Sequence, residues 1–168
     1  MITRRQISLG ILATPILVPF SRSVYAEEKV SEELPEELST SSLIYLTPIK
    51  SDGEESTCKG EIWFAFHEKE IYVVTPSEAW RAKAIGKDLT EARIWVGEFG
   101  NWRQANEAYR KAPELMATGS IVEDKEVHQE VLKVMGEKYS DGWDTWGPRF
   151  KSALEDGSRV MIKYKPKP

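Results

Sequence analysis

The stretch from Lys59 to Gly97 constrains the fold of this chain more than any other part of it. An apolar segment from Glu61 to Phe66 is followed by a short charged connection and a second apolar segment from Ile71 to Thr75, which is typical of two strands in a hairpin. The first segment is apolar at every position from Ile62 onward, so it is expected to be buried on both faces. The stretch therefore predicts a buried β-hairpin.

A helix is predicted directly after this hairpin. The tetrapeptide Thr75-Pro76-Ser77-Glu78 has the order of a capping box, with threonine at the cap, proline at the first helical position and glutamate three residues after the cap. The helix would run to about Ile85, and Gly86 would end it.

Two basic residues, Arg81 and Lys83, lie inside this predicted helix. Free N–H groups at the helix start, together with these cations, could hold a phosphate. Residues two apart on a helix point about 200 degrees apart, so Arg81, which reaches back toward the helix start, is the better candidate. The alternative is an ordinary hairpin followed by a solvated basic helix, because the chain has no Gly-rich phosphate loop.

The remaining pattern predicts one α+β domain over residues 43–168, mainly an antiparallel, barrel-like sheet of about six strands with three or four flanking helices. The strands are joined by hairpins and not by regular βαβ crossovers. Further strands are expected at 43–50, 92–99, 114–123 and 158–164. Helices are expected in three places: a short one within 100–113, an amphipathic one that begins at Glu123 or Asp124, and one from Pro148 to Gly157.

The N-terminus has the features of an export signal. Residues 1–26 carry Arg4 and Arg5, then an apolar run to Phe20 and a small-residue cleavage site that ends at Ala26. The paired arginines resemble a twin-arginine signal, which predicts a periplasmic or cell-envelope protein with no stable membrane span after signal removal. The alternatives are a general secretory signal and an uncleaved anchor.

The net charge of the chain argues against some classes of binding partner. Three of the 23 basic residues lie in the first 26, so the remainder has 20 basic against 27 acidic residues and a net charge of −7. Such an acidic body argues against nucleic-acid binding, which needs a basic face. Residues 27–42 are acidic and Ser/Thr-rich and are interpreted as a linker or arm.

The sequence shows no motif of an enzyme that works without a cofactor, so no catalytic residue is predicted. Cys58 is the only cysteine, and His67 and His128 are the only histidines and show no metal-ligand spacing, so no metal site is predicted. The chain also lacks a G-x-S-x-G elbow and a G-x-G-x-x-G loop. If the protein is an enzyme, a bound cofactor is expected to carry the chemistry.

The order of the hairpin, the Thr75 turn with Arg81 and Lys83, and the strand from Arg93 to Gly97 resembles the pyridoxamine 5'-phosphate oxidase-like, FMN-binding split-barrel superfamily. The resemblance implies a homodimer with FMN, or a deazaflavin, near the subunit interface. It places the ring along Ile62, Trp63 and Phe64, and it makes Thr75, Ser77, Arg81 and Lys83 phosphate candidates. The adjacent Arg-Lys pair of that superfamily is replaced here by Trp80-Arg81 with a displaced Lys83.

Three functions remain open at this point. The first is a flavin-dependent oxidoreductase of the split-barrel type that acts on a small-molecule or electron-transfer substrate. The second is a cofactor-free protein of the cell envelope that binds a small ligand or a partner in a groove bordered by tryptophans. The third is a structural envelope protein.

Overall fold

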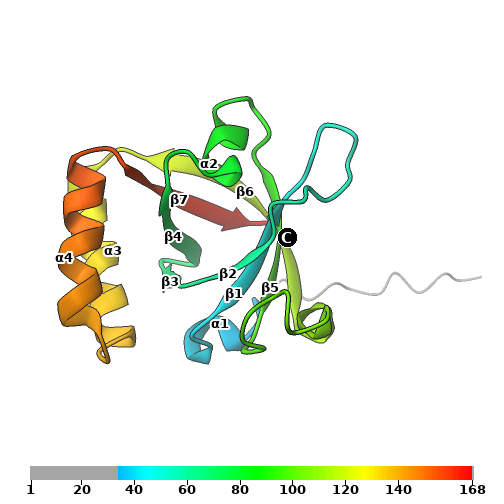
Figure 1. The fold of residues 1–168 in the computed structure, drawn as a ribbon, viewed down its shortest axis with the longest axis horizontal. Helices are drawn as coiled ribbons and strands as arrows, with labels where there is room; N and C mark the ends of the chain where they lie inside the picture. Colours follow the sequence, from blue (N-terminus) through cyan, green and yellow to red (C-terminus); the bar gives the residue numbers. More distant parts are fainter. Residues whose placement is uncertain (1–33, 168) are drawn as a thin grey trace, which may run out of the picture. The chain divides into compact units, whose positions relative to one another are not determined.

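The computed structural model describes residues 34–167, so the predicted signal peptide and the first part of the acidic arm lie outside the described residues. Seven strands form one antiparallel sheet in the order β2-β1-β5-β6-β7-β4-β3. The sheet curls into a half-barrel, visible in Figure 1. The strands are β1 (Ile44–Pro48), β2 (Gly60–Ile62), β3 (Ala65–His67), β4 (Glu70–Pro76), β5 (Glu91–Val96), β6 (Glu114–Val122) and β7 (Arg159–Pro166).

The predicted α+β class and antiparallel barrel are confirmed, but the predicted strand from Glu61 to Phe66 is broken. Its first part is β2, which pairs with β1, and its last part is β3, which pairs with β4. These two strands form opposite edges of the sheet, although only Trp63 and Phe64 separate them in sequence. The chain therefore passes from one edge of the sheet to the other at Trp63 and Phe64, which is how the curled sheet comes to close on itself.

The helices pack against both clusters of apolar side chains, two on each side of the sheet. The described part of the chain contains α1 (Glu37–Thr40), α2 (Trp80–Ile85), α3 (Lys125–Lys138) and α4 (Trp143–Glu155), and a 3₁₀ helix (Ala108–Lys111). Helix α3 begins where the sequence predicted, because the Asp124 side chain accepts hydrogen bonds from the backbone N–H groups of Glu126 and Val127. Figure 1 shows α3 and α4 side by side at one end of the sheet, with α2 over another part of it. No helix among the described residues is long and apolar enough to cross a membrane.

Three helix predictions were wrong in their starting points or type. Thr75 and Pro76 belong to β4, where Thr75 pairs with Val160 of β7, and α2 begins only at Trp80. The predicted capping box does not form, because strand pairing uses its first two residues. Helix α4 begins five residues before Pro148, and the 100–113 excursion contains turns and the 3₁₀ helix in place of an α-helix.

Apolar side chains fill the space inside the half-barrel and the space between the sheet and α3 and α4. The inner cluster includes Ile44, Val73 and Ile94, and Leu38 of α1 is buried against it. The outer cluster joins Tyr72 and Met161 of the sheet to Met135 of α3 and Phe150 of α4. Burial of these two clusters is the main source of stability for a single domain of this size.

Candidate functional site

Helix α2 separates the two basic residues that the sequence placed together. Lys83 lies on the outer side, where its ammonium is 2.6 Å from the Glu78 carboxylate and both side chains are exposed. Arg81 shares the inner side of the helix with Ile85, which packs against the inner core. The structure therefore directs these two cations to different sides of α2, as the helical spacing predicted.

Arg81 reaches the start of β2 and the core of the barrel. Its Nη2 lies so close to Gly60 that a side chain at this position would have its Cβ 3.3 Å away. Burial raises the pKa of the Tyr164 phenol on β7, and the positive charge of Arg81 acts against that rise. Gly60 thus leaves room for a guanidinium inside the rim of the barrel.

The Arg81 guanidinium has no counter-charge among residues 34–167. Its Nε is buried and has no hydrogen-bond acceptor there, and no described carboxylate forms an ion pair with it. A buried, unsatisfied donor on a charged group is costly, so the position suits an anion that would accept from it.

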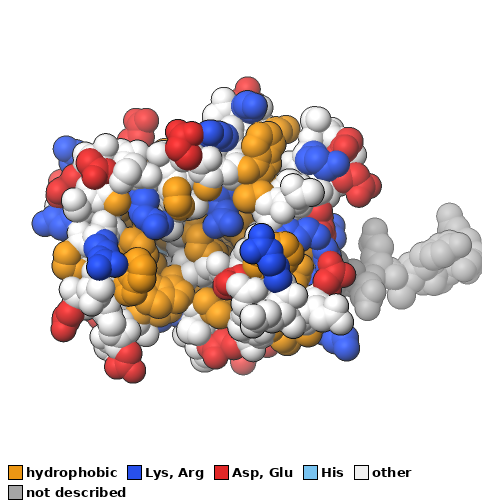
Figure 2. All heavy atoms as spheres, viewed as in Figure 1, with side chains coloured by type: hydrophobic (Ala, Val, Ile, Leu, Met, Phe, Trp, Pro, Cys, Tyr) orange, Lys and Arg blue, Asp and Glu red, His pale blue; other side chains and the backbone are white. Residues whose placement is uncertain are grey.

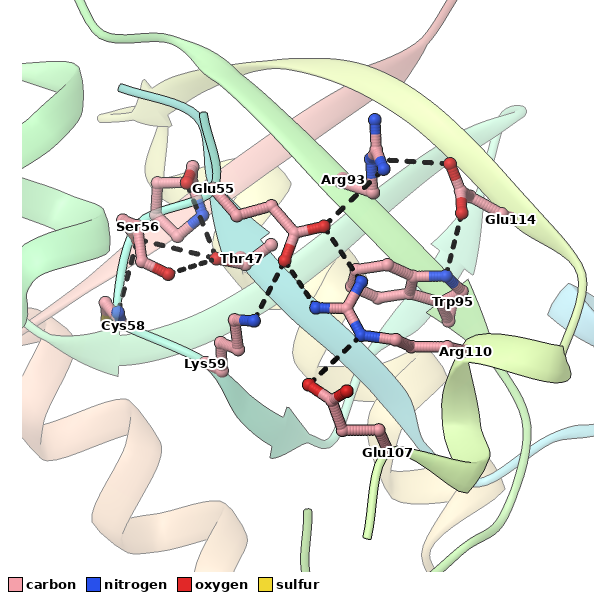
Figure 3. Close-up of polar contacts among 11 residues, drawn as sticks. Thr47, Glu55, Ser56, Cys58, Lys59, Arg93, Trp95, Glu107, Arg110 and Glu114 are labelled. Carbon is pink, nitrogen blue, oxygen red and sulfur yellow. Dashed lines mark hydrogen bonds and ion pairs between the residues drawn. The ribbon is translucent and has the colours of Figure 1, made fainter. Parts of the chain in front are cut away.

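In the loop between β1 and β2, by contrast, a carboxylate is surrounded by several cations (Figure 3). The carboxylate of Glu55 is 2.6 Å from Nη2 of Arg110, 2.9 Å from Nζ of Lys59 and 3.5 Å from Nη1 of Arg93. These cations lower the pKa of Glu55 to about 2, with the hydrogen bonds from Arg110 as the largest cause. The Arg110 guanidinium also lies 4.9 Å from the centre of the Trp95 ring. The network fixes the loop to the 100–113 excursion and to β5.

A hollow of about 460 Å³ lies between this loop and α2. Its lining includes Glu55, Ser56, Cys58 and Trp80. The hydroxyl of Thr47 donates to the backbone oxygen of Ser56, 3.1 Å away, which holds the loop against β1. The hollow therefore has a fixed polar wall on one side and the indole of Trp80 on the other.

The segment where the chain passes between the sheet edges carries the predicted ring positions. Ile62 and Trp63 are half-buried, and Phe64 is buried. The Trp63 ring stacks on Tyr139 at 4.4 Å and meets Trp146 edge-on at 6.3 Å. Figure 2 shows hydrophobic side chains at the surface in the region between α4 and β3, with basic side chains beside them. Tyr139 thus covers one face of the Trp63 ring, and Trp146 lies at a steep angle to it.

Tyr139 and Lys138, at the end of α3, contact this segment. The Tyr139 hydroxyl accepts a hydrogen bond from the backbone N–H of Phe64, 2.9 Å away. The backbone oxygens of Phe64 and Ser42 are also 2.9 Å from it, and its single proton is donated to one of them or shared between the two. The Lys138 ammonium lies 3.3 Å from the centre of the Phe64 ring. Burial lowers the pKa of Lys138 to about 8.

The predicted site residues are thus only partly brought together. Thr75 is buried in β4, and the Ser77 hydroxyl donates to the backbone oxygen of Ser158 at 3.2 Å. Lys83 is paired away from the barrel, which leaves Arg81 as the basic residue of the predicted set that faces inward. No group of three metal-ligating side chains occurs among the described residues.

Reasoning from the sequence missed Glu55, Arg110, Lys138 and Tyr139. Glu55 and Arg110 are 55 residues apart in the chain, so no local pattern connects them. Lys138 and Tyr139 lie at the end of the predicted amphipathic helix, where their contact with Phe64 depends on how α3 packs against β3.

No protein-family model matches the chain, and no curated protein matches it either. Solved structures do match. The heme storage protein HutZ of Vibrio cholerae is 15% identical, with 79% of this chain and 87% of that chain covered and a TM-score of 0.56. A candidate pyridoxamine 5'-phosphate oxidase of Listeria innocua is 15% identical, with 79% and 89% covered and a TM-score of 0.50. An F420 reductase is 17% identical, with 80% and 97% covered and a TM-score of 0.50.

The chain has the split-barrel fold. The predicted likeness to pyridoxamine 5'-phosphate oxidase-like proteins is therefore confirmed at the level of the fold. The names of these split-barrel neighbours refer to heme storage, to a pyridoxamine phosphate oxidase and to F420 reduction, so the fold is compatible with more than one ligand chemistry.

Proposed function

We propose that this split-barrel protein binds FMN through Arg81 and acts as a flavin-dependent oxidoreductase. The observation that carries the proposal is the Arg81 guanidinium, which points into the rim of the barrel with a buried Nε and no acceptor among the described residues. A phosphate oxygen would supply that acceptor and the missing negative charge. A deazaflavin phosphate would satisfy the same group.

The residues fit this cofactor in part. Arg81 would hold the phosphate, and Gly60 leaves the space in which the guanidinium lies. Trp63 offers a half-buried aromatic face for the ring, and Lys138 places a positive charge near Phe64. Lys83 is paired with Glu78 on the outer side of α2 and would not contribute. When bound, a flavin supplies hydride or electron transfer, and the chain's own residues would bind and orient it.

The test uses the purified protein and one matched pair of variants. The visible spectrum is recorded as isolated, and FMN is then titrated while its fluorescence is measured. Arg81→Ala removes charge-assisted hydrogen bonds to a phosphate and should weaken FMN binding by about 10- to 100-fold. Lys83→Ala, two residues along the same helix, should leave FMN affinity unchanged.

Two results would contradict this proposal. One is the absence of flavin absorbance together with no uptake of added FMN or deazaflavin. The other is equal FMN affinity in the wild type and Arg81→Ala. A Soret band on addition of hemin, with no uptake of flavin, would also argue against it.

The second candidate is a cofactor-free binding protein of the cell envelope. Tyr139 favours it, because its hydroxyl already occupies the backbone N–H and C=O of Phe64 and so removes two groups that could meet a flavin ring. Under this function Arg81→Ala would leave binding at the aromatic surface near Trp63 largely unchanged.

Export and assembly are part of the proposal. We expect cleavage after Ala26, transport to the periplasm or cell envelope, and a homodimer. The mass of the protein recovered from the periplasmic fraction would test the cleavage, and light scattering of the purified protein would test the dimer.

A further inference from the structure

A large groove runs between α3, α4 and the beginning of β7, away from Arg81. Its volume is about 1170 Å³. Its floor is apolar and contains Leu132, Trp143, Leu154, Val160 and Met161. Open grooves of this size with an apolar floor are suited to small ligands with a large apolar part.

Trp143 is packed between the two helices that border the groove. It lies so close to Gly136 of α3 and Gly147 of α4 that a Cβ at either glycine would be within 2.8 Å of its indole. The chain turns back between the two helices, so the start of α3 lies beside the end of α4 (Figure 1). Helix α4 has 13 residues and is about 20 Å long. The lining residues include both the start and the end of α4, so the groove extends over most of the length of that helix.

Charged side chains of both signs line this groove. Lys125, Lys151 and Arg159 line the part near the start of α3 and the end of α4, whereas Trp143 and Asp144 line the other end and Lys133 lies between. Glu123 and Glu155 lie near the same three cations, yet no ion pair joins these five groups within residues 34–167. At this end of the groove the three cations outnumber the two carboxylates, although the net charge of the body is negative.

We propose that this groove binds a fatty acid, with its carboxylate near Lys125, Lys151 and Arg159 and its acyl chain directed toward Trp143. The apolar floor would cover the chain, and the cations would select an anionic head at one end. Fatty-acid binding here is independent of flavin binding, because none of the groove residues belongs to the Arg81 site.

The experiment measures binding of laurate to the full-length protein by calorimetry, with dodecanol as the uncharged comparison. Laurate is expected to bind at one site and more tightly than dodecanol. The exposed double variant Lys125→Glu, Lys151→Glu should weaken laurate binding by about tenfold, because it replaces attraction with repulsion. The matched double variant Lys111→Glu, Lys165→Glu changes two exposed lysines outside the groove and should bind laurate like the wild type.

A second measurement fixes the direction of the chain without changing the charges. A laurate with bromine on its last carbon should quench tryptophan fluorescence, and Trp143→Phe should remove most of that quenching while the other five tryptophans remain. The proposal is overturned if laurate shows no saturable binding, if dodecanol binds as tightly, or if both lysine double variants behave alike. Unchanged quenching in Trp143→Phe would overturn the assigned direction. FMN affinity measured on the same variants should not change.

Discussion

Two arginines border the loop between β1 and β2, and they differ in what faces them. Arg110 is 2.6 Å from the carboxylate of Glu55 and also donates to Glu107. Arg81 lies against Gly60 at the other end of the same loop and has no carboxylate partner among the described residues. All the charges of the first arrangement are paired, whereas the buried Nε of Arg81 in the second has no acceptor among the described residues.

Arg110 is therefore a cation that stabilises the fold, whereas Arg81 is a cation that is available to bind a ligand. Removing one partner of a partly buried ion pair leaves the other charge without compensation and destabilises the fold. Removing Arg81, a half-buried cation with no carboxylate partner among the described residues, takes away no ion pair and relieves the cost of the unsatisfied Nε. The same chemical group should therefore have opposite effects on stability at these two positions.

The largest effect is expected for Glu55→Gln. The substitution removes the negative charge that Arg110, Lys59 and Arg93 share, and it should lower the free energy of unfolding by about 3 kcal/mol. Chemical denaturation followed by circular dichroism measures this change. Glu54→Gln alters the exposed neighbouring residue and is the control. A loss below about 0.5 kcal/mol for Glu55→Gln would show that the ion pairs of Glu55 stabilise the fold no more than solvent-exposed ion pairs do.

The acid stability of the protein should depend on the same carboxylate. The pKa of Glu55 is lowered from 4.5 to about 2 in the folded state, so its contribution is fully present above the unfolded pKa and is lost as the pH falls toward 2. The wild type should lose about 2 kcal/mol through this group between about pH 5 and about pH 3. Denaturation curves of the wild type and Glu55→Gln should converge over that range. Parallel curves would contradict the assigned pKa.

The direct comparison of the two arginines uses methionine, which keeps the length of the side chain. Arg110→Met should lower the free energy of unfolding by about 2 kcal/mol, because Glu55 loses its closest partner. Arg81→Met should leave it unchanged or raise it by about 1 kcal/mol, since no ion pair is lost and the buried, unsatisfied Nε is removed. Equal losses in the two variants would mean that Arg81 is also a structural cation.

Much of the fold could be predicted from local patterns in the sequence. Periodicity and turn residues located most strands, and Asp124 marked the start of α3. The break at Trp63 and Phe64 could not be predicted, because a continuous apolar run does not reveal that its halves pair with different strands. The capping box failed for a similar reason, since the pairing of Thr75 with Val160 overrides a local preference.

The candidate site could be predicted only where helical geometry determines it. The spacing of Arg81 and Lys83 indicated that they point to different sides of α2, and the structure bears this out. The Glu55 network and the contact of Tyr139 with Phe64 join residues far apart in the chain. They depend on the closed sheet and on the docking of α3, which no local pattern specifies.

The smallest effect is expected for Lys83→Ala. This variant tests whether Lys83 stays paired with Glu78 when FMN is bound. Lys83 pairs with Glu78, but side-chain exposures of 47% and 85% mean that water and salt screen the pair. The variant should unfold at the temperature of the wild type and bind FMN with the same affinity, as differential scanning fluorimetry and the FMN titration would show. Weaker FMN binding in Lys83→Ala would mean that Lys83 leaves Glu78 when the phosphate is present. The phosphate would then be held by both Arg81 and Lys83. The difference between an unpaired Arg81 and a paired Lys83 would apply only to the protein without FMN.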